Sequence, residues 1–189
     1  MVPADSRSLG GVVLDLEVRS ATREDRGAIR HLVEGAFAVD GRDGREELDI
    51  VDTIWKLDAA CEHLELVGAV EGIVSGYVLG SWGDLEDRPV AGIAPVAVTP
   101  ALQGQGVGTA LMKELVERAD RSRLPLLVLL GSPDYYCKFG FESSVPLGIH
   151  YEPAGAKSPY FMVRRLGTYT AMFRGAYRYA WEIGGDQRA

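Results

Sequence analysis

Cysteine and histidine are scarce in this chain of 189 residues, which contains two cysteines and three histidines. Cys61 and Cys137 lie far apart in the sequence and outside any C-x-x-C spacing. A disulfide framework needs several cysteines, and a zinc site needs cysteine or histidine ligands at short spacings. We therefore expect no structural disulfide and no bound metal, and we expect both cysteines to pack as small buried residues.

Basic residues are also fewer than acidic residues. The 20 Lys and Arg residues stand against 27 Asp and Glu residues, which gives a formal net charge of −7 and a pI near 5.0. Proteins that bind nucleic acid or anionic lipid carry basic patches that neutralise phosphate charge. Neither nucleic acid nor a membrane is therefore an expected partner.

Long hydrophobic runs are also missing. No run approaches the roughly 18 apolar residues of a membrane-spanning helix, and the segment from Met1 to Gly11 has no apolar core of the signal-peptide kind. We therefore expect a cytoplasmic protein with a flexible tail over residues 1–11. Residues 12–189 have the length of one domain, and the chain is 47% hydrophobic, which predicts a single domain with its own core.

The first half of this domain shows clear periodicities. Alternating apolar residues predict a strand from Val12 to Val18, and helical spacing predicts two helices between residues 22 and 57. Thr22, with Asp25 three residues later, resembles a capping box at the start of the first helix. A Gly- and Asp-rich turn from Ala38 to Gly44 separates the two helices. Two β-prone runs joined by Glu71-Gly72 then predict a hairpin, Leu64 to Val70 and Ile73 to Trp82.

The second half predicts a parallel crossover. A strand from Val90 to Val98, interrupted by Pro95, is followed by a helix from Thr109 to Arg121 and a fully buried strand from Leu126 to Leu130. Such a strand-helix-strand unit joins two parallel strands with a right-handed connection. A short helix over Pro133 to Phe139 comes next, then three weaker segments: strands over Gly148 to Tyr151 and Tyr160 to Leu166, and an aromatic stretch from Tyr169 to Trp181 without clear period. The fold class is therefore α/β with a mixed sheet.

Three alternating glycines, Gly104, Gly106 and Gly108, directly precede the predicted helix of the crossover. A plain strand-to-helix turn could use them, but they also expose backbone N–H groups at the positive end of a helix dipole, where a phosphate binds well. No Lys follows the last glycine as in a P-loop, and the spacing differs from the dinucleotide-binding fingerprint. The loop therefore predicts a phosphate cradle of another kind.

The segment around this loop resembles the motif Q/R-x-x-G-x-G/A of the GNAT superfamily of acyl-CoA-dependent N-acetyltransferases, which Gln103, Gly106 and Gly108 match. The run from Leu129 to Phe141 is similar to the second family motif, F-Y-x-x-x-G-F. Its L-G-x-P-x-Y-Y pattern, with the earlier P-V-A-V run, looks like that of the YhbS-like bacterial acetyltransferases. The two motifs occur in the right order, so the resemblance covers roughly residues 64–141.

The resemblance implies a mixed, mostly antiparallel sheet flanked by helices, in which two parallel strands splay apart and the pantetheine of acetyl-CoA fills the gap. Pro95 fits a place where strand pairing is broken. The backbone after Pro95 would hold the pantetheine and polarise the thioester, and the glycine loop would hold the pyrophosphate. The implied cofactor-binding residues are Val96, Ala97, Val98, Gln103, Gly104, Gln105, Gly106, Val107, Gly108 and Thr109.

Tyr136 occupies the position of the tyrosine in the second motif and is the implied catalytic residue, because a phenol there can give a proton to the departing thiolate. Tyr135 and Phe139 are expected to pack and orient the short helix. The family often has an Asn before this helix, whereas this chain has Ser132-Pro133-Asp134, which puts the pantetheine contact of that Asn in doubt.

The implied activity is transfer of an acetyl group from acetyl-CoA to a primary amine of a small molecule or peptide, by direct attack and without a metal. The alternative is a non-catalytic acyl-CoA-binding or sensing module, because no general base is evident. Glu65, Glu71 and Asp84 are candidates that we expect to be solvated instead.

Two further groups of residues have open interpretations. Acidic side chains form either a solvated face or a surface that attracts a cationic amine: Asp40, Asp43, Glu46, Glu47, Asp49, Asp52, Asp84, Glu86 and Asp87. Aromatic side chains near the end of the chain pack in the core, line an acceptor pocket or form the contact of a homodimer: Tyr169, Phe173, Tyr177, Tyr179 and Trp181.

Overall fold

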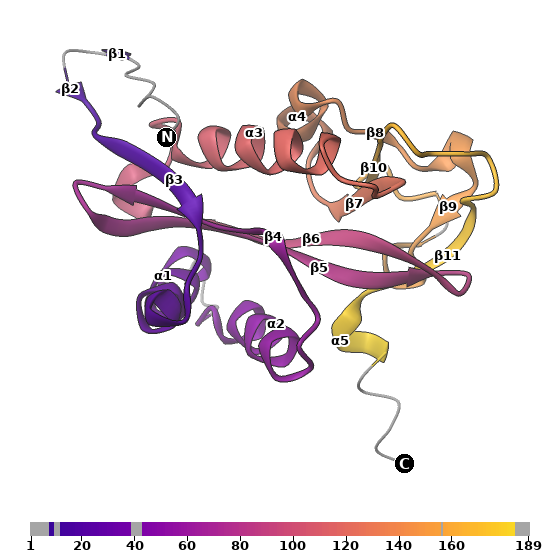
Figure 1. Cartoon of the computed structure of the whole chain (residues 1–189), viewed down its shortest axis with the longest axis horizontal. Helices are drawn as coiled ribbons and strands as arrows, with labels where there is room; N and C mark the ends of the chain where they lie inside the picture. Colours follow the sequence, from indigo (N-terminus) through magenta and orange to yellow (C-terminus); the bar gives the residue numbers. More distant parts are fainter. Residues whose placement is uncertain (1–7, 10–11, 39–42, 156, 184–189) are drawn as a thin grey trace.

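The computed structural model describes residues 8–9, 12–38, 43–155 and 157–183, and these residues build a mixed sheet with helices on both faces (Figure 1). Seven strands follow one another across this sheet: β3 (Leu16–Ser20), β4 (Ala60–Val70), β5 (Ile73–Leu85), β6 (Arg88–Val98), β7 (Leu126–Leu130), β10 (Phe161–Arg165) and β8 (Glu142–Ser143). Off this path, β11 (Gly175–Arg178) pairs with β5 and with β9 (Ile149–His150). Among the main neighbours only β6 and β7 run parallel, so the predicted fold class is confirmed.

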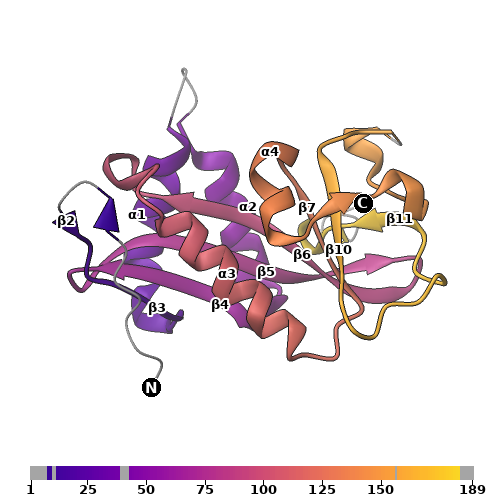
Figure 2. The same cartoon turned by 90° about the horizontal axis from the view of Figure 1, so that it is seen from above.

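The helices form two layers, one on each face of the main sheet. Figures 1 and 2 show α3 (Val107–Asp120) and α4 (Pro133–Tyr136) on one face, and α1 (Arg26–Phe37), α2 (Arg45–Lys56) and α5 (Ala180–Ile183) on the other. Short 3-10 segments complete the connections: η1 (Arg23–Asp25), η2 (Pro100–Leu102), η3 (Cys137–Phe139), η4 (Val145–Leu147) and η5 (Glu152–Ala154). No helix in the described ranges is long and apolar enough to cross a membrane, and the cytoplasmic location stays a prediction.

The core follows from the alternation of side chains along the strands. Leu66 and Val78 point toward α3 and pack with Leu111 and Leu115, whereas the neighbouring Val67 points the other way. On that second face, Val67 and Tyr77 are buried by the apolar stripes of α1 and α2, with Ile29, Val33, Val51 and Ile54. The predicted hairpin is confirmed and is longer at both ends than the periodicity indicated.

The expected first strand is wrong in one respect, because it is broken into two. β2 (Val12–Val13) pairs with β1 (Ser8–Leu9), and the main sheet begins only at Leu16, which lies opposite Val70 of β4. The chain thus changes its pairing partner between residues 13 and 16. The flexible tail was expected over residues 1–11, of which residues 1–7 and 10–11 lie outside the described part of the chain.

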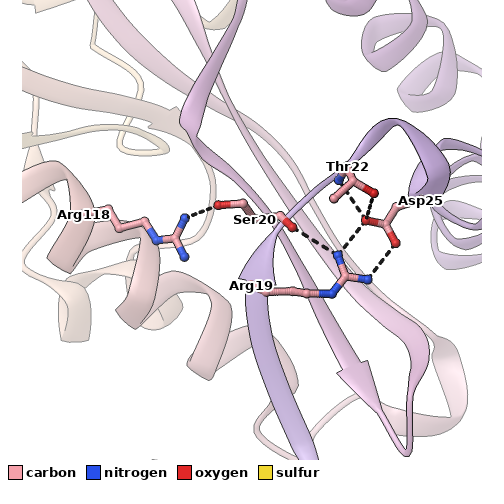
Figure 3. Close-up of polar contacts among 5 residues, drawn as sticks. All are labelled: Arg19, Ser20, Thr22, Asp25 and Arg118. Atoms are coloured by element: carbon pink, nitrogen blue, oxygen red, sulfur yellow. Dashed lines mark hydrogen bonds and ion pairs between the residues drawn. The ribbon is translucent and has the colours of Figure 1, made fainter. Parts of the chain in front are cut away.

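An ion pair anchors β3 to the start of the first helix (Figure 3). The Arg19 guanidinium donates to both carboxylate oxygens of Asp25, at 2.6 and 2.8 Å, and the backbone N–H of Thr22 donates to the same carboxylate at 2.8 Å. These contacts hold the pKa of Asp25 well below its usual range. On the other side of β3, Arg118 of α3 donates to the Ser20 hydroxyl at 2.7 Å, so the edge strand is tied to both helical layers.

Candidate functional site

The two parallel strands separate shortly after they meet. β6 pairs with β7 only from Ala91 to Ile93, although β6 continues to Val98. On its other side, β6 has an extra residue in its pairing with β5, because Ile93 lies opposite Gly80 and Val96 opposite Val78. The irregularity contains Pro95, which lacks the N–H that a ladder needs. The predicted splay between two parallel strands is therefore confirmed, and Pro95 lies where it begins.

Backbone groups of β6 face the open side of this splay. The N–H of Thr99 donates to the carbonyl of Ser75 on β5 at 2.9 Å, so Thr99 and Ala97 direct their backbone groups toward β5. By alternation, Val96 and Val98 direct theirs into the gap on the β7 side. Part of this gap is already used, because the Gln103 side-chain amide donates to the Val98 carbonyl at 3.2 Å.

The glycine loop leads directly into α3, which begins at Val107, two residues earlier than predicted. Gly104 and Gly106 have φ angles of 75° and 94°, in the left-handed region that favours glycine. The first N–H groups of a helix have no partner within the helix, and the described residues offer none to Val107, Gly108 or Thr109. The Gln105 side-chain amide donates a hydrogen bond to the Ala101 carbonyl at 2.8 Å. The loop therefore presents free N–H groups at the positive end of the α3 dipole.

Tyr136 ends α4, and its ring packs on the backbone at the end of β7. A Cβ added to Gly131 would lie 2.2 Å from this ring, so only glycine leaves room for it. Tyr135 and Phe141 meet the ring edge-on, at centroid distances of 4.9 and 6.0 Å. Burial raises the pKa of Tyr136 to about 12, so the phenol keeps its proton at neutral pH. Within the described ranges no hydrogen bond engages its hydroxyl, which leaves that group free for a ligand.

Lys138 is a candidate site residue that the sequence analysis missed. Its ammonium lies 3.5 Å from the Thr109 hydroxyl and 4.0 Å from the centre of the Tyr135 ring. Tyr135 is therefore more than a packing residue, since its hydroxyl also reaches the first turn of α3 beside Gly108 and Thr109. Within the described ranges Lys138 has no ion pair with a carboxylate. A positive charge thus stands beside a helix N-terminus, where anions rather than cations are stabilised.

Two of the three candidate general bases, Glu65 and Asp84, are engaged by other side chains instead of being solvated. Glu65 is held rather than solvated, because Oε1 accepts hydrogen bonds from Trp55 Nε1 and Tyr77 Oη, each at 2.8 Å. Asp84 pairs with Arg178 at 3.1 Å, so its expected solvation is wrong as well. Glu71 is exposed in the turn between β4 and β5. In the part of the chain that the structure describes, no contact links any of these carboxylates to Tyr136, and we assign no base.

Much of the acidic group is engaged in local contacts. Asp52 forms an ion pair with Arg30, Asp43 lies 3.2 Å from Arg45, and Glu86 accepts a hydrogen bond from the backbone of Ala176. Asp40 lies outside the described residues. The attraction of a cationic amine to this surface stays a prediction.

Among the aromatic residues near the end of the chain, core packing prevails for Tyr177 and Tyr179, which are 1% and 2% exposed. The ring of Tyr179 lies on Gly92, where an added Cβ would come within 2.7 Å of it, and Trp181 stacks on Tyr179 at 4.1 Å. Tyr169 and Phe173 pack at the border of the same cluster. The homodimer contact stays a prediction.

An open cavity of about 410 Å³ lies at the end of β7, lined by Leu130, Gly131, Ser132, Ala154, Ser158 and Tyr160. Leu130 follows Leu126 and Val128 at intervals of two, so its side chain belongs to the face opposite α3. Gly131 contacts the cavity and also the Tyr136 ring. The cavity and the glycine loop therefore reach the Tyr136 region from opposite faces of the sheet.

The cysteines differ in their surroundings. Cys61 is buried, and burial raises the pKa of its thiol to about 12, whereas Cys137 is exposed, so its expected burial is wrong. The described ranges contain no cluster of three or more potential metal ligands.

Comparison with known proteins gives a consistent assignment. Residues 27–141 match the model of the acetyltransferase (GNAT) family. The uncharacterized N-acetyltransferase YhbS of Escherichia coli K12 is 36% identical over 98 residues, which are 51% of this chain and 58% of the relative. The uncharacterized N-acetyltransferase YjhQ of the same strain is 28% identical over 124 residues, 64% of this chain and 66% of the relative. The matches thus span less than two thirds of the length of either curated relative.

Two solved structures are similar over nearly the whole chain. The structure of YhbS from Escherichia coli in complex with CoA has a TM-score of 0.78 and 25% identity, covering 94% of this chain and 96% of that one. A GNAT acetyltransferase from Brucella melitensis in complex with acetyl-CoA has a TM-score of 0.71 and 27% identity, covering 88% and 97%. With the family match over more than half of the sequence, the splayed strands and the glycine loop, these likenesses lead to one conclusion: the chain belongs to the GNAT family of acetyltransferases.

Proposed function

We propose that this protein transfers the acetyl group of acetyl-CoA to a primary amine. The observation that carries the proposal is the separation of β6 from β7 directly after Ile93. Tyr136 packs on the same core cluster as Val96 and Val98 of β6, and Gly108 in the first turn of α3 lies against Val98. The resemblance implies that pantetheine fills such a gap, and two similar structures contain CoA or acetyl-CoA. The binding of acetyl-CoA here is supported by the backbone of β6 that faces the gap and by the free N–H groups at the start of α3.

Each part of the ligand has a matching group in this chain. The pyrophosphate would lie against the N–H groups of residues 106–109, where Gly104 and Gly106 bring no side chain into the approach. Lys138 adds a positive charge at the same end of α3. The pantetheine amides would pair with the backbone of Val96 and Val98, and an N–H there would stabilise negative charge on the thioester oxygen during attack.

The chemistry needs a neutral amine and a good leaving group. The amine nitrogen attacks the thioester carbonyl carbon, a C–N bond forms, the C–S bond breaks, and the amine loses its proton to solvent. Tyr136 donates its phenolic proton to the departing thiolate and regains one from solvent, a role for which its raised pKa keeps it protonated. The acceptor, a small molecule or a peptide N-terminus, would approach through the cavity at the end of β7, on the face opposite α3.

A second candidate is an acyl-CoA-binding or sensing module without turnover. It is favoured by one observation, which is that the candidate carboxylates Glu65 and Asp84 are engaged by Trp55, Tyr77 and Arg178 rather than free beside Tyr136.

Two measurements distinguish the acetyltransferase from the sensing module. The first is a thiol-release assay with acetyl-CoA and a panel of primary amines, and the second is a calorimetric titration with acetyl-CoA. We expect binding together with amine-dependent release. Binding without release for any amine supports the sensing module, and absence of binding contradicts both.

A further inference from the structure

Arg164 joins two parts of the site that lie far apart in the sequence. It lies on β10, two residues after Met162, which packs in the core below α3, so both side chains point to the face that carries α3 and α4. Its Nη1 donates to the Phe139 carbonyl at 2.9 Å. Its Nη2 donates to both carboxylate oxygens of Asp120, at 2.8 and 3.1 Å.

Each of the two residues that Arg164 contacts is the last residue of a helix near the proposed site. Phe139 is the last residue of η3 and lies three residues after Tyr136, and carbonyls at a helix end lack a partner within the helix. Asp120 is the last residue of α3, and the glycine loop leads into the opposite end of this helix. One guanidinium therefore connects the segment that holds Tyr136 with the helix that would hold the coenzyme.

The segment that carries Tyr136 depends on such contacts. Together α4 and η3 span only residues 133–139, far too short for a helix that is stable on its own. The following Gly140 has a φ of 80°, and a Cβ there would lie 2.0 Å from Nη1 of Arg164, so the glycine leaves the space that the guanidinium needs.

We propose that Arg164 is a positioning residue for the acetyl transfer, which acts by fixing Tyr136 relative to acetyl-CoA bound at α3. The inference rests on the function proposed above. A misplacement of a reacting group by about 1 Å can cost about 100-fold in rate. Loss of the guanidinium is therefore expected to lower the rate of the chemical step while the glycine loop still binds acetyl-CoA.

Arg165 provides a matched control. It is the next residue on the same strand and carries the same charge, but its side chain points to the opposite face and pairs with Glu142 at 2.6 Å. Arg165→Gln removes one positive charge and one ion pair without touching α3 or η3.

The first experiment compares Arg164→Gln, Arg164→Lys and Arg165→Gln in the parent and in the Tyr136→Phe background, with kcat and the KM for acetyl-CoA as readouts. We expect Arg164→Gln to lower kcat by about 10- to 100-fold and to change the KM by less than about threefold. Arg164→Lys should recover part of the loss, and Arg165→Gln should have little effect.

In the Tyr136→Phe background, the loss of kcat caused by Arg164→Gln should largely disappear, because Arg164 acts through the Tyr136 hydroxyl. A full loss in both backgrounds, or an equal loss in Arg165→Gln, overturns the proposal.

A second readout does not need turnover. With ¹³C-labelled tyrosine, the ring resonance of Tyr136 is assigned by its absence in Tyr136→Phe and followed in the CoA-bound protein. We expect it to shift and broaden in Arg164→Gln while the resonance of Tyr177 is unchanged. An unchanged Tyr136 resonance contradicts the positioning role even if the protein proves to be a sensor without activity. If Arg164→Gln does not fold, Arg164→Lys and Asp120→Asn carry both measurements, because each keeps part of the contact.

Discussion

At the scale of single residues, the site depends on a few side chains whose neighbours are unusual for their type. Tyr136 is a half-buried phenol whose hydroxyl has no hydrogen-bond partner in the described part of the chain, and Lys138 is a cation beside the positive end of a helix. A protonated phenol without a partner is free to donate a hydrogen bond, and cations are not normally stabilised at helix N-termini. Both features are explained if an acyl-CoA supplies the missing thiolate and phosphate.

Tyr136→Phe keeps the ring and its contacts with Tyr135 and Phe141 and removes only the proton donor. General acid catalysis is worth about 10²- to 10⁴-fold, so kcat should fall by that order while the affinity for acetyl-CoA hardly changes. Steady-state kinetics and calorimetry check this. Tyr135→Phe is the comparison and should lower kcat far less. Equal kcat for parent and Tyr136→Phe, with chemistry shown to limit the rate, would remove Tyr136 from the mechanism.

Lys138→Gln should weaken binding of CoA by about 2- to 5-fold, because one exposed charge pair contributes less than about 1 kcal/mol. Lys138→Arg should bind like the parent. The measurement is calorimetry at low and high salt, with CoA and with dephospho-CoA. A loss of the same size with both ligands places Lys138 at the pyrophosphate, and a loss only with CoA places it at the 3′-phosphate. Unchanged affinity of Lys138→Gln for both ligands at low salt would mean that this ammonium contacts neither.

At the scale of elements, the site is formed where α3, α4 and the β6–β7 pair end or begin. The glycine loop starts α3, the end of β7 leads into α4, and the bulge in β6 opens the gap between them. The breaks in regular structure leave backbone N–H groups free at the start of α3. Under the proposed function, these backbone groups rather than side chains bind most of the coenzyme.

Gly106→Val should abolish or greatly weaken acetyl-CoA binding while the protein remains folded. A β-branched residue at φ 94° is strained by about 1–3 kcal/mol, and its side chain would enter the space before the first turn of α3. Gly72→Val is a matched control, since Gly72 has φ 78°, equally free surroundings and a place in the distant β4–β5 turn. Calorimetry should show lost binding only for Gly106→Val. If the control loses binding equally, backbone strain rather than the cradle is responsible.

At the scale of the whole molecule, the edge strand β3 is held to the rest by charge as well as by pairing with β4. Asp25 is the buried end of this contact, with a side chain 10% exposed, and Arg19 and Thr22 hold its carboxylate in the charged form (Figure 3). The partly buried pair therefore links the stability of the fold to pH.

Asp25→Asn should lower the free energy of unfolding at pH 7 by about 1–3 kcal/mol, since it breaks a partly buried pair. Because the pKa of Asp25 is lower in the folded state, its contribution is present above about pH 4 and is lost as the pH falls further. Urea unfolding at pH 7 and pH 3 should therefore show a smaller difference between parent and variant at pH 3. Asp43→Asn, which breaks an exposed pair with Arg45, should change stability by less than about 1 kcal/mol. A difference between parent and Asp25→Asn that does not depend on pH would contradict this account.

Patterns within short stretches of sequence were enough to predict the order of most elements and the position of the glycine loop. Periodicity is a local property, so the helix that begins at Arg26, the hairpin at Glu71-Gly72 and the strand from Leu126 could be predicted from neighbouring residues alone. The glycines before α3 and the tyrosine of the second motif were identified for the same reason, because their spacing within a few residues carries the signal.

The contacts between side chains that are distant in the sequence could not be predicted and are known only from the folded structure. Glu65 is engaged by Trp55 from α2 and Tyr77 from β5, Lys138 comes to lie beside Thr109, and Arg164 reaches Phe139. Pro95 indicated where strand pairing breaks, but the pairing of β7 with only three residues of β6 is not specified by any local pattern. The side-chain hydrogen bonds named above join residues 10 to 29 positions apart, and their partners are set by how helices and strands pack rather than by the residues on either side.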